Sequence, residues 1–158
     1  MTAPYRSRLV ESSGRKFRVF DIDPGILENP IHGVLREVLL DRSQPYVAIS
    51  YAWATDKPCI PIDCGDGTLP VLVTKNCYAA LRRLRETSRK RSLWIDALCI
   101  NQQDKDERGY QVAMMRDIYS NASCVYIWLG EGTDRSDYAL DWVHRCLPPG
   151  FPVNSRED

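Results

Sequence analysis

The sequence predicts a mixed α/β fold in which a parallel core sheet is flanked by helices. Two apolar runs, residues 93–100 and 124–130, have the composition of strands that are covered on both faces. Between them lies a segment with apolar residues at helical spacing, so the order is strand, helix, strand. Strands joined through a helix usually pair in parallel by a right-handed crossover. Residues 93–130 are therefore expected to form the centre of the fold.

The N-terminal half is expected to add shorter strands to this core. Residues 17–22 alternate in polarity and end at a turn, and residues 31–40 favour a strand over a helix. Residues 46–53 are rich in β-forming side chains and predict a central strand. Residues 59–63 and 69–73 flank a glycine-containing turn, which predicts a β-hairpin near a sheet edge.

Three helices are expected between and after these strands. Thr74 is a suitable N-cap for the first, and its buried stripe is expected to be Cys77, Ala80, Leu81 and Leu84. The second follows Asp104, ends near Asn121, and is expected to bury Val112, Met115, Ile118 and Tyr119. A third begins at Asp134 or Ser136 and would bury Tyr138, Leu140, Trp142, Val143 and Cys146. The chain is expected to form one domain over residues 1–147, with residues 148–158 as a tail or the start of a linker.

The amino-acid composition limits the classes of function that the protein is expected to have. Lys plus Arg and Asp plus Glu number 21 each, so no net field attracts nucleic acid or an anionic membrane. The basic run at residues 82–91 is expected to be a solvated helix end. No apolar run reaches the ~20 residues of a membrane span, and the first residues lack a signal-peptide core, which favours a cytoplasmic protein. The six cysteines form no C-x-x-C pair, so no metal site is expected, and Cys77, Cys99 and Cys124 are expected to act as small core residues.

Polar and aromatic side chains gather where the predicted parallel strands end. In open α/β sheets, ligands bind at that edge, so a small-molecule crevice is expected there. Its candidate residues are Ser50, Tyr51, Trp53, Asn101, Gln102, Glu107, Arg108 and Glu131. Each also has a purely structural interpretation: the aromatic rings as strand packing, the amides as loop caps and Glu107 as a residue favoured by the helix dipole.

Asp96 interrupts the apolar run at residues 93–100 and therefore needs a partner. We expect a structural role, in which Arg108, Arg116 or backbone amides hold its carboxylate. The phosphate-binding glycine motifs and the G-x-S-x-G nucleophile motif are absent from the sequence, so dehydrogenase, P-loop and serine hydrolase chemistry has no support.

Four consecutive blocks of the sequence carry a family resemblance. They are YVAISYAW at 46–53, VTKNCYAALRRLR at 73–85, LWIDALCINQQDKDERGYQVAMMRDIYSNA at 93–122 and VYIWLG at 125–130. These blocks resemble the HET domain, the heterokaryon incompatibility domain of filamentous fungi. The resemblance runs from about residue 17 to residue 130, and the WIDALCINQ block is the most specific part of it.

The resemblance implies a toxic output module for non-self recognition, programmed cell death and innate immunity in fungi. It also implies a TIR-like sheet, because HET domains are held to be distantly similar to TIR domains. Enzymatic TIR domains cleave NAD with a glutamate on the helix after the third strand. The corresponding segment here, residues 134–147, has no glutamate; its nearest acids are Asp137 and Asp141, and Glu107 or Glu131 is the candidate carboxylate.

Three hypotheses follow from the resemblance. The first is a cell-death signalling module that is activated by proximity or oligomerisation with protein partners or with itself. The second is a TIR-like enzyme that cleaves NAD, in which NAD is a substrate and no cofactor is required; Tyr51 or Trp53 would stack on the base. The third is a non-catalytic sensor that binds a nucleotide as ligand.

Overall fold

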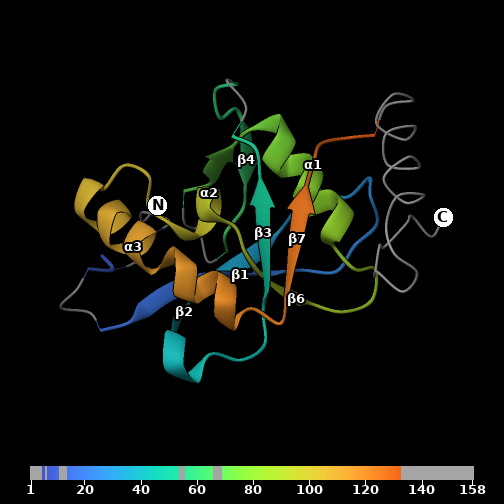
Figure 1. The fold of residues 1–158 in the computed structure, drawn as a ribbon. Helices are drawn as coiled ribbons and strands as arrows, with labels where there is room; N and C mark the ends of the chain where they lie inside the picture. The colour runs from blue at the N-terminus through green and yellow to red at the C-terminus, as the bar shows by residue number, and fades with distance from the viewer. Residues whose placement is uncertain (1–4, 6, 11–13, 54–55, 66–68, 133–158) are drawn as a thin grey trace, which may run out of the picture.

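The protein is built on a five-stranded mixed sheet (Figure 1). The structure, a computed structural model, describes residues 5, 7–10, 14–53, 56–65 and 69–132. The strand order is β2-β1-β6-β3-β7. The bounds are β1 Lys16–Ile22, β2 Gly33–Leu39, β3 Val47–Tyr51, β6 Arg91–Trp94 and β7 Cys124–Trp128. β3 pairs in parallel with β6 and β7, whereas β1 pairs antiparallel with β2 and β6. The predicted mixed α/β fold is confirmed, while likeness to TIR domains stays a prediction.

Helices and a separate hairpin surround this sheet. The helices are α1 Lys75–Leu84, the single turn α2 Asp96–Cys99, α3 Lys105–Asn121 and the 3-10 turn η2 Leu40–Arg42. The predicted hairpin is confirmed as an antiparallel pair, β4 Ile60–Ile62 and β5 Val71–Val73, in a sheet of its own. The predicted cap of α1 is also confirmed, because Thr74 Oγ1 accepts a hydrogen bond from the Cys77 amide at 3.2 Å.

α1 and α3 lie on opposite faces of the sheet. Trp94 of β6 is in register with Ala48 and contacts Tyr119 of α3 edge-on, with ring centroids 5.1 Å apart. Trp128 of β7 is in register with Tyr51 and donates to Asn76 of α1 at 2.8 Å. Ala48 and Tyr51 are an odd number of positions apart along β3, so their side chains point to opposite faces. α3 therefore lies over one face of the sheet and α1 over the other.

The predicted strand over residues 93–100 is wrong in its second half. β6 ends at Trp94, and residues 96–99 form the turn α2, closed by the Ile100 amide donating to the Asp96 carbonyl. Leu98, Cys99 and Ile100 are buried, as the apolar run indicated. A short buried apolar run has no periodicity, so the sequence pattern does not distinguish a strand from a helical turn. The prediction of a strand through residue 100 was wrong for this reason.

The buried side of α3 also differs from the prediction. Ile118 is buried as expected, but Val112 is 52% exposed. The buried positions of the helix are Glu107, Gln111, Met114 and Ile118. Two polar residues occupy the inner face because they find partners there: Glu107 pairs with Arg18, and Gln111 donates to the Lys16 carbonyl at 2.8 Å.

The strand over residues 124–130 was expected to be covered on both faces, and this expectation is wrong. β7 is the last of the described strands in the sheet order, and Cys124, Val125 and Ile127 on it are exposed. Cys77 and Cys99 are buried as predicted, whereas Cys124 is not. The predicted third helix lies outside the described residues. Among the helices of the described part, none has the length and apolar character of a membrane span.

Candidate functional site

The C-terminal ends of β3 and β6 are neighbours, and the chain leaves them toward opposite faces of the sheet. β3 continues to the hairpin and α1, while β6 continues through α2 to α3. In open α/β sheets this change of direction opens a crevice beyond the strand ends, which is where ligands bind. The strand ends at which the crevice was predicted lie at this switch point, while binding of a ligand there stays a prediction.

Asp96 and Trp53 meet at the switch point. Trp53 Nε1 donates to Asp96 Oδ2 at 2.8 Å, and the Ala97 amide donates to Asp96 Oδ1 at 2.8 Å. The Trp53 ring lies nearly parallel to that of Tyr51, with centroids 6.3 Å apart and an angle of 25° between the planes. Trp53 is 55% exposed, so its ring presents a face to solvent while its N–H is engaged. We call Ser50, Tyr51, Trp53, Asp96 and Gln102 the strand-end cluster.

The expected arginine partner of Asp96 is replaced by Trp53. The predicted alternative of a backbone amide is confirmed by Ala97, but no ion pair joins Asp96 to Arg108 or Arg116 among the described residues. Burial raises the pKa of Asp96 above its ordinary value, and the hydrogen bonds from Trp53 and Ala97 only partly oppose this. Asp96 is thus a half-buried carboxylate with weakened acidity, a property found often in ligand sites and in structural networks.

The remaining predicted polar residues at this edge divide between the cluster and the loop. Gln102 Nε2 donates to the Asp96 carbonyl at 2.9 Å, which ties the loop to α2. Asn101 acts as a loop cap, because its Oδ1 accepts from the Gln103 amide at 3.2 Å. Ser50 is half-buried on the face that carries α3, and Tyr51 points to the other face, where burial raises the pKa of its hydroxyl.

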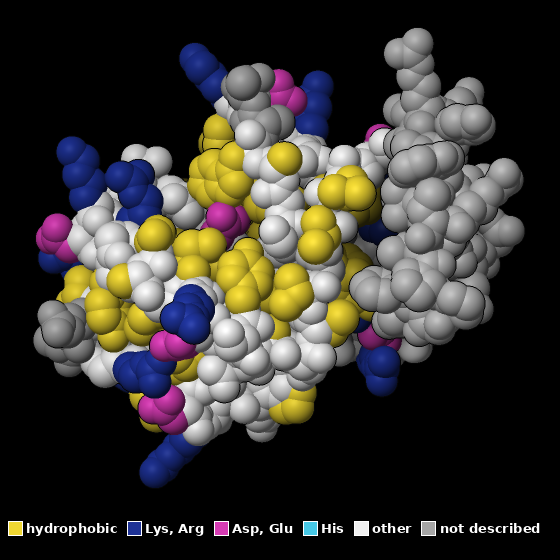
Figure 2. Space-filling view, in the orientation of Figure 1, with side chains coloured by type: hydrophobic (Ala, Val, Ile, Leu, Met, Phe, Trp, Pro, Cys, Tyr) yellow, Lys and Arg dark blue, Asp and Glu magenta, His cyan; other side chains and the backbone are white. Residues whose placement is uncertain are grey.

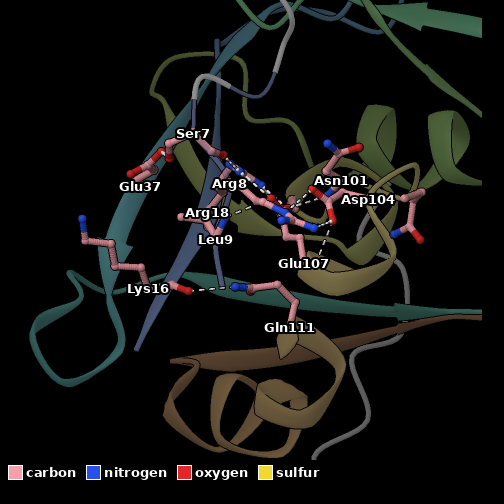
Figure 3. Close-up of polar contacts among 12 residues, drawn as sticks. Ser7, Arg8, Leu9, Lys16, Arg18, Glu37, Asn101, Asp104, Glu107 and Gln111 are labelled. Carbon is pink, nitrogen blue, oxygen red and sulfur yellow. Dashed lines mark hydrogen bonds and ion pairs between the residues drawn. The ribbon is translucent and has the colours of Figure 1, made fainter. Parts of the chain in front are cut away.

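Glu107 is sealed inside a second polar cluster (Figure 3). Arg18 Nη1 donates to Oε1 at 2.6 Å and Arg18 Nη2 donates to Oε2 at 3.1 Å. The Asn101 amide donates to Oε1 at 2.9 Å, and the Leu9 amide donates to Oε2 at 3.0 Å. Burial opposes ionisation of Glu107, but these four donors outweigh it and hold its pKa below the ordinary value. The side chain is 0% exposed, so it has no free lone pair facing a ligand.

The N-terminal segment closes this second cluster, which was not predicted from the sequence. Arg18 Nη2 donates to the Ser7 carbonyl, and the Arg18 guanidinium lies 4.8 Å from the centroid of the Tyr5 ring (Figure 3 shows the contacts of Ser7 and Leu9). Leu9 is buried beside them. Arg18 stands between two apolar residues of a predicted strand, and a charge in that position was the signal that a buried partner must exist.

Arg108 and Glu131 do not join the strand-end cluster. Arg108 is exposed on the first turn of α3, and Glu131 is exposed beyond the end of β7. In the described part of the chain, neither side chain has a contact with Asp96 or Trp53. The eight predicted candidates therefore separate into four members of the strand-end cluster, the loop cap Asn101, the sealed carboxylate Glu107 and two surface residues.

Two pockets on the described surface lie away from the strand-end cluster. One of about 480 Å³ is lined by residues of β2 and η2 and by Lys16, and another of about 340 Å³ lies around Asp23, Asn29 and Arg85. Neither is lined by the strand-end cluster. Within the described ranges, no group of His, Cys, Asp and Glu side chains is gathered in a way that could hold a metal ion. At the strand ends, Asp96 offers hydrogen bonding and the exposed ring of Trp53 offers stacking.

The fold and the strand-end cluster define a mixed α/β domain with a switch-point edge, and comparisons with known proteins assign its family. The model of the family described as heterokaryon incompatibility protein (HET) matches residues 46–154. The chain belongs to the HET family. It is also similar to heterokaryon incompatibility protein 6, OR allele, of Neurospora crassa, with 32% identity over 149 residues that cover 87% of this chain and 22% of the relative. The chain therefore spans about a fifth of that relative's length. No solved structure gives a significant match.

Proposed function

We propose that this chain is a HET-type signalling module that causes cell death in fungal heterokaryon incompatibility, where it acts in the cytoplasm. Proximity or oligomerisation with partner proteins activates it. Support comes from membership of the HET family and from the name of the Neurospora relative. Because the chain matches only 22% of that relative, the partners and the trigger of the relative are not carried over to this chain.

The burial of Glu107 is the observation that favours signalling by assembly over catalysis. A carboxylate that stabilises a developing positive charge on ribose must lie beside the reacting carbon. Glu107 instead accepts four hydrogen bonds inside the protein and is 0% exposed. Freeing it would leave Arg18, which is 2% exposed, as an unpaired buried charge. Glu107 thus serves the fold.

Forced proximity in cells tests this function. The chain is fused to a domain that dimerises on addition of a small molecule and is expressed in a filamentous fungus. Growth should stop after the dimeriser is added, and the same fusion carrying a dimerisation-defective tag should grow normally at equal protein level. Unimpaired growth of the dimerising fusion would remove the basis of the proposal.

Cleavage of NAD is the second candidate function, and Asp96 is the observation that favours it. This carboxylate lies at the switch point, its pKa is raised by burial, and the stacked rings of Tyr51 and Trp53 lie beside it. Asp96 would take the role for which the sequence offered Glu107 and Glu131. NAD would be the substrate, bound with its base on the Trp53 ring.

Release of nicotinamide tests the second function. The concentrated chain is incubated with NAD, and free nicotinamide is measured by chromatography. Release that Asp96→Asn abolishes and that Glu131→Gln leaves unchanged would establish the enzyme with Asp96 as its carboxylate. Absence of release from the assembled wild-type chain would dismiss it, and calorimetric titration with NAD would then detect a nucleotide that binds without being cleaved.

A further inference from the structure

Among the described strands, β7 ends the sheet, and it carries exposed apolar side chains. It is the last strand in the sheet order, with β3 as its neighbour among the described strands. Its exposed apolar residues alternate along the strand and its continuation: Val125 is 41% exposed, Ile127 is 72% exposed and Leu129 is 80% exposed. Figure 2 shows hydrophobic side chains gathering over β7 and the adjoining part of the sheet. Such an edge is a template for pairing with another strand.

The opposite edge of the sheet is built differently. β2 also ends the strand order, but it carries the charged residues Arg36 and Glu37. Charges on an edge strand hinder pairing with a second chain, and natural proteins protect their edges in this way. Residues 124–130 contain no charged side chain and no proline. The two edges of one sheet therefore differ in the feature that governs association.

We propose that β7 is a self-association surface on which the β7 strand of a second copy pairs antiparallel. A two-fold axis through the middle of the strand places each side chain close to side chains of the same strand in the other copy, so a charged strand would repel itself. β7 is neutral, and the whole chain has 21 basic and 21 acidic residues, so no net repulsion opposes a second copy.

The geometry of this pairing buries the exposed stripe. Val125 and Ile127 are in register with Ala48 and Ser50, so they lie on the face that carries α3. Antiparallel pairing about an axis perpendicular to the sheet keeps that face on the same side in both copies. The apolar stripes then adjoin, and two five-stranded sheets become one continuous sheet. This surface rests on the proposed function, since it names the contact through which proximity would be sensed.

Sedimentation of the 158-residue chain at increasing concentration tests the surface. The wild type should shift from monomer to dimer, and Ile127→Lys should raise the concentration needed by more than tenfold without lowering Tm. Leu72→Lys is the matched control, because Leu72 is also an exposed strand residue, at 52%, but lies in the separate hairpin. It should dimerise like the wild type.

Two results would overturn the surface: a wild type that stays monomeric at all concentrations, and an Ile127→Lys variant that dimerises normally. If the wild type is monomeric and its Tm also falls on Ile127→Lys, the stripe packs within a single copy of the chain. The dimeriser experiment separates this surface from the proposed function, because the tag brings two copies together without the β7 contact. If a fusion carrying Ile127→Lys still arrests growth, the proposed function stands even where the β7 surface is disproved.

Discussion

Arg18 and Glu107 form an ion pair in which the two side chains are 2% and 0% exposed and Nη1 lies 2.6 Å from Oε1. The pair joins β1 to the first turn of α3, and Leu9 and Asn101 bring the N-terminal segment and the β6–α3 loop to the same carboxylate. One buried contact thus fixes the loop that leads away from the strand-end cluster. Its loss is expected to weaken the fold and to loosen that edge of the sheet together.

Removing one partner of this pair should destabilise the protein strongly. Arg18→Met leaves Glu107 buried without its cation, and breaking a buried pair in this way costs about 3–5 kcal/mol. Urea unfolding followed by tryptophan fluorescence measures the free energy. Arg108→Met is the matched control, because Arg108 is exposed, and it should change the free energy by less than about 0.5 kcal/mol. Equal stability of Arg18→Met and the wild type would show that the pair does not hold the fold.

Lowering the pH should remove the contribution of Glu107 to the free energy of unfolding. Its pKa is lower in the folded protein than in the unfolded chain, so its contribution is complete above the unfolded pKa of about 4.3 and disappears as the pH falls through the folded pKa. The difference in unfolding free energy between the wild type and Glu107→Gln should therefore shrink between about pH 6 and about pH 3. A difference that is constant over this range would contradict the assignment.

Asp96 should show the opposite pH dependence. Its pKa is raised in the folded protein, so its contribution is complete below the unfolded pKa and is lost as the pH rises through the folded pKa. Compared with Asp96→Asn, the wild type should gain stability as the pH falls from about 7 to about 4. Thermal unfolding of both proteins across this range measures the effect. A gain by the variant on acidification would mean that Asp96 has a cationic partner after all.

Gly33 should tolerate no side chain. A Cβ built there would lie 2.5 Å from Phe20 Cζ and 2.6 Å from the Asp21 carbonyl oxygen, and the backbone oxygen cannot move aside freely. Gly33→Ala should cost roughly 2 kcal/mol or more through overpacking. Gly109→Ala is the matched comparison, because Gly109 lies within α3 and a Cβ built there has nothing within 4 Å. This substitution should increase the stability by about 0.5–1 kcal/mol. Melting temperatures that move in the same direction for both variants would refute this explanation.

The sequence predicted the elements well where local patterns decide them. The strands over residues 17–22, 31–40 and 46–53 and the hairpin occur close to their predicted positions, and Thr74 caps α1. The position of the strand-end cluster also followed, because the order of strands and helices alone brings the ends of β3 and β6 together. Periodicity, turn residues and caps are local signals, and each was readable without tertiary information.

The errors came from partners that are far away in the sequence. Arg18 and Glu107 are 89 positions apart, and their pairing turned the polar residues of α3 inward. Arg85 was assigned to a solvated basic run, but it is 8% exposed and donates to the carbonyls of residues 26, 29 and 30. The place of β7 at the sheet edge depends on strand order, which its apolar composition does not reveal.

The NAD content of cells that express the dimerising fusion distinguishes signalling by assembly from cleavage of NAD. NAD is measured in the interval between addition of the dimeriser and the first loss of viability. If the protein signals by assembly and Glu107 is structural, growth stops while NAD stays at the level of cells carrying the dimerisation-defective tag. A fall in NAD that precedes growth arrest, and that Asp96→Asn prevents, would contradict signalling by assembly.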